Sequence, residues 1–201
     1  MKKALWSIVL LCFFTAVSVG QNSKKADIAS VVAAGKVSDD RYANTYFGIV
    51  LSAPKAQFKG PSSVSIAGRQ ARFVDIVYDS PDGANNYTLA VLADSLDNYP
   101  RDMSLDVYVR SVRHQLEKQG ALETQREEFP VEIAGVHFTG VVLKVIQAPN
   151  FGYYRGLYAT FMKGYVLLFE VQCRHEERLQ QLLSSSLVIN PTSRSSRPVS
   201  R

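Results

Sequence analysis

Alternating apolar and polar residues predict β-strands over most of the middle of the chain. Residues 71–78 alternate along their whole length, as expected for a strand with two different faces. Lys163-Gly164 separates two apolar segments, and glycine in a two-residue turn supplies the positive φ that a tight hairpin needs. Residues 55–69 contain glycine, proline and several serines and are predicted to form a loop. The predicted strands cover residues 46–51, 71–78, 87–93, 123–128, 136–146, 153–162 and 165–172.

In two segments, the spacing of apolar residues is that of a helix instead of a strand. In residues 103–119, apolar side chains recur at spacings that place them on one helical face. Asp102 or Ser104 can accept the free amide hydrogens at the beginning of this helix. Residues 176–187 form a second predicted helix with a leucine-rich side. The residues of the two apolar faces are Leu105, Tyr108, Val109, Val112 and Leu116, and Leu179, Leu182, Leu183 and Leu187.

The order of these elements predicts an α+β fold. No predicted helix separates neighbouring strands between Gly120 and the last helix, so those strands are expected to be antiparallel. Two amphipathic helices need an apolar surface to cover. We therefore expect a mainly antiparallel, curved β-sheet of six to seven strands covered by two main helices.

The beginning of the chain has the pattern of a secretory signal peptide. Lys2 and Lys3 precede a nearly uninterrupted apolar run, and Ser18-Val19-Gly20 places small residues where signal peptidase requires them. We expect cleavage after Gly20 and an exported protein, periplasmic or secreted. The apolar run has about 14 residues, whereas a helix that spans a bilayer needs roughly 20. An uncleaved segment that tethers the protein to the membrane is the alternative.

The rest of the chain is expected to consist of a linker, one domain and a tail. Residues 21–40 are polar and alanine-rich and are predicted to be a flexible linker. Residues 191–201 contain mainly serine and arginine and are predicted to be a disordered basic tail. Between them, residues 41–190 are numerous enough to bury one sizeable core.

Composition and charge exclude several classes of protein. The chain has 201 residues, of which 46% are hydrophobic and 20% charged, and this balance argues against a disordered protein. Loss of Lys2 and Lys3 with the signal peptide lowers the formal net charge from +5 to +3. That charge, without a basic stripe in the domain, argues against nucleic acid as a partner. Cys173 is then the one cysteine left, and its position after an apolar run predicts a buried, inert thiol.

Three groups of residues carry a resemblance to a known family. They are Tyr42-x-Asn44-x-x-Phe47-Gly48-Ile49-x-Leu51-x-x-Pro54, Pro130-x-x-Ile133-x-Gly135-x-x-Phe138, and Gly164-Tyr165-Val166-Leu167-x-Phe169 followed by a leucine-rich helix that ends at Leu187-Val188. Over residues 42–190 they resemble the opening strand, a long strand and the closing hairpin and helix of PsbP/DcrB-like domains. The resemblance implies an α/β/α sandwich and an exported accessory protein, because the better-known members bind or stabilise a larger partner rather than catalyse. It implies no site residues.

The sequence contains no recognisable catalytic or metal-binding motif. Glu127 and Glu128 are adjacent in a predicted strand and should point to opposite faces. The segment from His175 resembles the start of a zinc-protease motif, but Leu179 stands where the second histidine is needed. We therefore expect a non-enzymatic domain without cofactor or metal. The alternative is a hydrolase or small-ligand-binding protein whose site assembles from distant residues such as His137, Glu128 and the tyrosines.

One aromatic cluster is a candidate surface for binding a partner. Tyrosine offers a large contact area with a polar tip, which suits recognition. Alternation along the strand divides the cluster, because Tyr154 and Tyr158 share one face and Tyr153 and Arg155 share the other. We expect the partner to be a protein or a cell-envelope component. The candidate partner-binding residues are Phe151, Tyr153, Tyr154, Arg155 and Tyr158.

Overall fold

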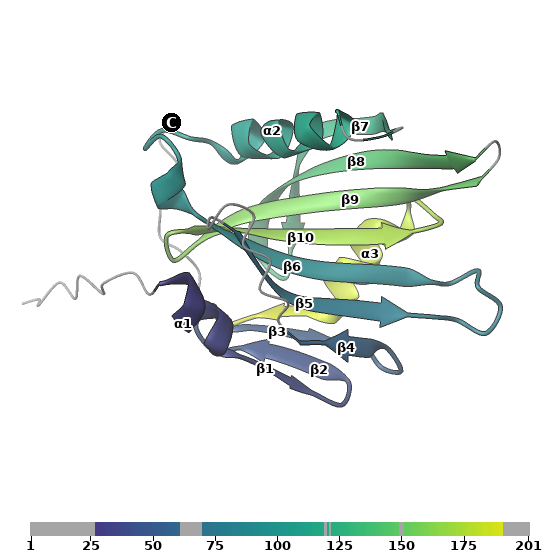
Figure 1. Ribbon diagram of the computed structural model, residues 1–201, viewed down its shortest axis with the longest axis horizontal. Helices are drawn as coiled ribbons and strands as arrows, with labels where there is room; N and C mark the ends of the chain where they lie inside the picture. The colour runs from purple at the N-terminus through teal and green to yellow at the C-terminus, as the bar shows by residue number, and fades with distance from the viewer. Residues whose placement is uncertain (1–26, 61–69, 119, 121, 149–150, 191–201) are drawn as a thin grey trace, which may run out of the picture.

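A large antiparallel sheet of seven strands is the main element of the protein. The computed structural model describes residues 27–60, 70–118, 120, 122–148 and 151–190 (Figure 1). The strand order is β4-β5-β6-β10-β9-β8-β7, and every neighbouring pair is antiparallel. The strands are β4 (Gln57–Lys59), β5 (Gln70–Tyr78), β6 (Tyr87–Ser95), β10 (Tyr165–Cys173), β9 (Phe151–Met162), β8 (Val136–Ala148) and β7 (Leu122–Ile133).

A smaller sheet and three α-helices complete the fold. The small sheet is antiparallel and has the order β1-β2-β3-β11. Its strands are β1 (Gly35–Ser38), β2 (Arg41–Asn44), β3 (Ile49–Ser52) and β11 (Leu187–Ile189). The helices are α1 (Ile28–Ala33), α2 (Leu105–Glu117) and α3 (Arg178–Ser186), and a 3-10 turn, η1 (Leu96–Asn98), follows β6.

The elements are arranged in layers around the large sheet. Helix α2 packs on one face, over β7, β8 and β9 (Figure 1). Helices α1 and α3 and the small sheet contribute to the core on the other face. The predicted α+β fold, with a seven-stranded antiparallel sheet and helices on both faces, is confirmed. The small sheet is an addition that the sequence pattern did not indicate.

The central strand β10 divides the interior into two cores. Leu167 and Phe169 are fully buried in the core shared with α3 and the small sheet. Val166 and Leu168, which point the opposite way, are buried in the core beneath α2. A strand covered on both faces needs apolar residues at successive positions, which explains the uninterrupted apolar run at the start of β10.

The predicted turn and helix cap are also confirmed. Lys163 and Gly164 join β9 to β10 with φ of 49° and 81°, the two positive values that a type I′ hairpin turn needs. Ser104 begins α2, and its side chain accepts a hydrogen bond from the Val107 amide at 3.2 Å. Tyr108 and Val109 on the predicted apolar face are buried.

The linker predicted over residues 21–40 is wrong from Asp27 onward, because α1 and β1 occupy this region. Val31 of α1 is fully buried in the larger core. Its carbonyl oxygen accepts a hydrogen bond of 2.9 Å from the amide of the buried Asn44, which ties α1 to the small sheet. Residues 21–26, the predicted signal peptide and the predicted tail over residues 191–201 lie outside the described residues.

These elements escaped prediction because they are short. Helix α1 has six residues, too few to show a helical period, and it depends on the Asp27 side chain, which accepts a hydrogen bond of 2.8 Å from the Ser30 amide. Strand β4 has three residues within the segment predicted as a loop, and it forms only by pairing with β5. No helix in the described residues combines the length and apolar character needed to cross a membrane.

Replacing Val31 with alanine tests whether α1 belongs to the core. We expect V31A to lower the free energy of unfolding by about 1–3 kcal/mol, because it leaves a cavity at a fully buried site. V37A is the matched control, since Val37 is 41% exposed and its truncation should change stability by less than about 0.5 kcal/mol. Urea unfolding measures both. Equal, small effects would mean that the helix does not pack as described.

Candidate functional site

One face of the large sheet changes from apolar to polar along its strands. On β10, Val166 and Leu168 pack beneath α2, and the next residues on the same face are Glu170 and Gln172. In the described residues, no helix packs across this second part of the face. We call it the polar face, and it comprises Arg72, Asp75, Arg155, Glu170 and Gln172.

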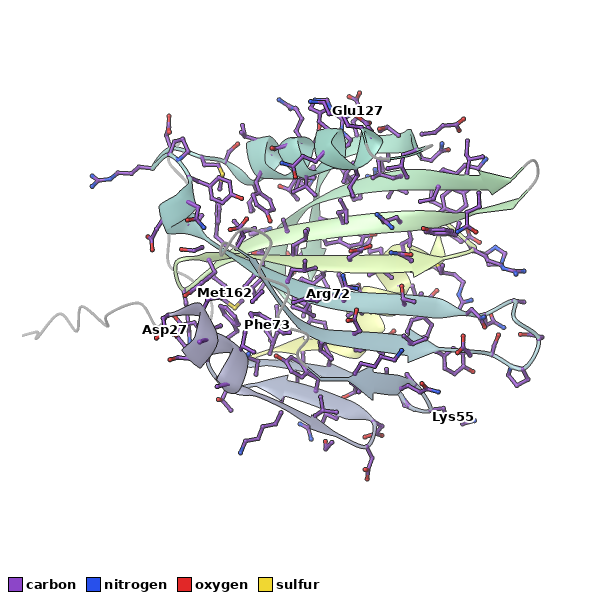
Figure 2. The ribbon with its side chains drawn as sticks, in the orientation of Figure 1. Asp27, Lys55, Arg72, Phe73, Glu127 and Met162 are labelled. Carbon is purple, nitrogen blue, oxygen red and sulfur yellow. The ribbon has the colours of Figure 1, made fainter. Side chains whose placement is uncertain are left out.

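Ion pairs connect three strands across the polar face. Arg72 of β5 lies near the middle of the molecule (Figure 2), and its Nε donates to Asp75 Oδ1 at 2.7 Å. Glu170 of β10 stands between two arginines: its Oε1 is 3.2 Å from Arg155 Nε on β9, and its Oε2 is 4.0 Å from Arg72 Nη1. The Glu170 side chain is 16% exposed and that of Arg155 is 19% exposed. The pairs are therefore partly shielded from water although no helix covers them.

Arg155 is held in place by its ion pair with Glu170 and by one long hydrogen bond from its Nη2 to Tyr153. Its Nε is shielded from solvent and, among the described residues, no acceptor is aligned with its hydrogen, despite the 3.2 Å distance to Glu170. Its Nη2 lies 3.5 Å from the hydroxyl oxygen of Tyr153. A half-buried cation that loses its counter-ion is costly, so Glu170 and Arg155 depend on each other. Beside them, the hydrogen bond to Asp75 raises the pKa of Arg72.

A groove continues the polar face to the ends of the strands. It lies where β5 and β10 end and β6 and β9 begin, and its volume is about 270 Å³. Strand register places Val77 beside Thr88 and Thr88 beside Gln172, all on the face that carries Glu170. We call this the strand-end groove, and the residues that line it include Val77, Asn86, Thr88, Tyr153, Gln172 and Arg174.

The predicted binding residues are divided between two environments. Tyr158 is 1% exposed and packs edge-to-face against Phe129, so it is a core residue. Tyr154 is partly buried against the same core. Tyr153 lines the strand-end groove, and Arg155 lies on the polar face. The side chain of Phe151 lies outside the described residues. The predicted division by strand alternation is confirmed, and Tyr153 and Arg155 are the two residues on the polar side.

The alternative site built from His137 and Glu128 does not assemble. His137 is exposed and stands opposite Glu132 in the β7–β8 pair. Glu128 is instead bound by α2, with its Oε1 3.1 Å from Arg113 Nε and its Oε2 3.6 Å from Arg110 Nε. Glu127 is exposed and is labelled at the top of the view in Figure 2. The two adjacent glutamates therefore differ in environment, as predicted.

The other histidines lie in separate places on the surface. His114 pairs with Glu117 of its own helix at 3.1 Å, and His175 lies 3.8 Å from Glu177. Both pairs link residues close in sequence and are exposed. Within the described ranges, no three histidine, cysteine, aspartate or glutamate side chains are placed to bind a metal ion.

Sequence reasoning missed Glu170 and Arg72, which organise the polar face. Glu170 interrupts the apolar run of β10. A charged residue in a central strand is unusual, and this signal could have identified Glu170 as a candidate site residue. Arg72 was harder to place, because the register of β5 shifts between Arg72 and Val74. If regular alternation is assumed through that bulge, the residues before it are assigned to the wrong face of the sheet.

Cys173 lies beside the strand-end groove as a buried free thiol. Its sulfur is 3.0 Å from the carbonyl oxygen of His175, which accepts its hydrogen bond. Burial raises the pKa of the thiol above its ordinary value. The thiolate is the reactive form, so this environment suppresses reactivity, and the predicted burial of Cys173 is confirmed.

Comparison with solved structures identifies the fold. The chain is similar to cyanobacterial PsbP (CyanoP) from Synechocystis sp. PCC 6803, with a TM-score of 0.52, 18% identity, and coverage of 78% of this chain and 96% of that chain. At this identity the similarity shows the fold alone, and the predicted PsbP-like fold is confirmed. LpqN, involved in cell envelope biogenesis of Mycobacterium tuberculosis, gives a TM-score of 0.38 at 11% identity over 68% of this chain and 92% of LpqN. No family model and no curated protein matches the sequence.

Thiol labelling tests the environment of Cys173. At pH 8 we expect the folded protein to react with Ellman's reagent at least about tenfold more slowly than the protein unfolded in urea, because burial and a raised pKa both reduce accessible thiolate. S184C in a C173S background is the control, since Ser184 is exposed on α3. Equally fast labelling at both positions in the folded protein would contradict the described burial.

Proposed function

We propose that this protein is an exported accessory domain that binds a partner in the cell envelope through the polar face of its large sheet. Export is supported by the signal-peptide pattern of residues 1–20. A binding role rather than catalysis is supported by the scattered positions of the histidines and by the failure of His137 and Glu128 to meet. The PsbP-like fold supplies the scaffold.

The observation that carries this proposal is the ion-pair network on the middle strands. Solvated sheet faces are common in antiparallel sheets, and separate exposed polar side chains are enough to keep them soluble. Here Glu170 is instead held between Arg72 and Arg155, each partly shielded from water. Holding long side chains in one geometry costs conformational entropy, and a preorganised charged surface repays that cost when a complementary partner docks.

Tyr153 and Arg155 are the residues best suited to contact the partner. Arginine and tyrosine are enriched among residues that dominate binding energy at protein interfaces. Tyr153 extends the polar face toward the strand-end groove, and its hydroxyl lies 3.5 Å from Arg155 Nη2. The two side chains therefore form one contact unit on β9, next to Glu170 on β10.

In-cell photocrosslinking tests the proposed surface. A benzophenone amino acid at position 153 should capture a specific partner, whereas the same amino acid at Gln180, on the exposed side of α3, should not. R155A should reduce the affinity for the captured partner at least about tenfold, because truncation of a hot-spot arginine costs about 2 kcal/mol or more and tenfold corresponds to about 1.4 kcal/mol.

R110A is the matched control for the arginine substitution. Arg110 is 52% exposed on α2, and Arg113 still pairs with Glu128 when it is removed. Circular dichroism must show that both variants fold. The proposal fails if positions 153 and 180 capture the same proteins, or if folded R155A binds as tightly as R110A.

A further inference from the structure

We infer that the strand-end groove binds an uncharged saccharide. This inference rests on the proposed binding role and names the chemical class of ligand for one end of the polar face. The groove is an open depression of about 270 Å³, slightly smaller than the roughly 300 Å³ at which sites for drug-sized molecules begin. That size suits one or two sugar rings lying across the strand ends.

The charges of the groove favour a neutral ligand. The residues that line it include one acid, Asp79, and one base, Arg174, so their formal charges cancel. On the adjoining polar face, Arg72 is paired with Asp75 and Arg155 with Glu170. A charged ligand that extended onto the polar face would have to displace one of these paired partners, whereas an uncharged polar ligand would not.

Hydrogen bonds already made by two residues that line the groove leave one acceptor and one donor for a ligand. Gln172 donates its amide hydrogen to Glu170 Oε1, which leaves its carbonyl oxygen to accept from a ligand. Asn86 Oδ1 accepts from the amide and the hydroxyl of Ser80, at 2.7 and 3.0 Å, so its NH2 is the group it offers a ligand. Sugar hydroxyls both donate and accept, and they match such a mixed set.

Apolar surface lies between these polar groups. Val77 contributes its side chain from β5, and Tyr153 contributes from β9 on the opposite side of the groove. The C–H face of a sugar ring can pack on such surfaces while its hydroxyls reach the flanking amides. Thr88 lies between Val77 and Gln172 in register and also lines the groove, so it adds a hydroxyl to the lining.

An NMR titration tests the inference. Protein purified from cells that produce the full chain, labelled with 15N, is titrated with glucose, galactose and N-acetylglucosamine, and with glucuronate as the charged counterpart. We expect a neutral sugar to shift the amide signals of Thr88 and Gln172, and glucuronate to bind more weakly. Q172A and T88V should each weaken binding roughly 3- to 10-fold, because each removes one hydrogen-bonding group.

Q180A is the matched control, because Gln180 is exposed on α3 and should leave sugar binding unchanged. The inference is overturned if none of the neutral sugars shifts the groove signals, if glucuronate binds best, or if Q172A binds as tightly as Q180A while folded. The crosslinking result at position 153 distinguishes the two proposals. If a protein partner is captured there but no sugar binds, the saccharide inference is wrong and the proposed function still holds.

Discussion

The fold depends on the central strand β10, because the two faces of this strand meet different surroundings. Its odd-numbered residues from Tyr165 to Cys173 are buried against the small sheet, α1 and α3, so that side of the strand is apolar throughout. Its even-numbered residues begin beneath α2 as Val166 and Leu168 and continue as Glu170 and Gln172. The length of α2 therefore decides how much of the second face is core. The remainder is free to carry polar residues without loss of the main hydrophobic contacts.

The same constraint determines what the sequence could reveal. The start of β10, the Lys163-Gly164 turn and the α2 period are strong local patterns, and each was predicted correctly. Helix α1, β4 and β11 have six residues or fewer and are stabilised by contacts with distant segments, so local pattern cannot identify them. The tyrosine cluster was chosen by composition, and the structure divides it as strand alternation predicted, because side-chain direction in a strand changes at each residue.

Polar residues at the site were harder to predict than the core. No local sequence pattern links Glu170 with Arg155. Their ion pair exists only because β9 and β10 pair as a hairpin in one particular register. Gln172 joins them through its hydrogen bond to Glu170. Arg72 comes from β5, which is two strands from β10 on the side opposite Arg155, and it reaches Glu170 across β6. A hydrophobic pattern predicts which residues are buried, but it carries no information about which charges will meet.

Comparison of two ion-pair clusters supports a role for the polar face other than stabilising the fold. In each, one glutamate stands between two arginines. Glu128 on β7 binds Arg110 and Arg113 and thereby fastens α2 to an edge strand, so its function in the structure is evident. Glu170 binds Arg72 and Arg155, which belong to strands already joined to the sheet by their backbone hydrogen bonds. The second cluster therefore docks no further element of the described chain. Its cost in conformational entropy supports the proposal that this surface is kept ordered for a molecule that binds there.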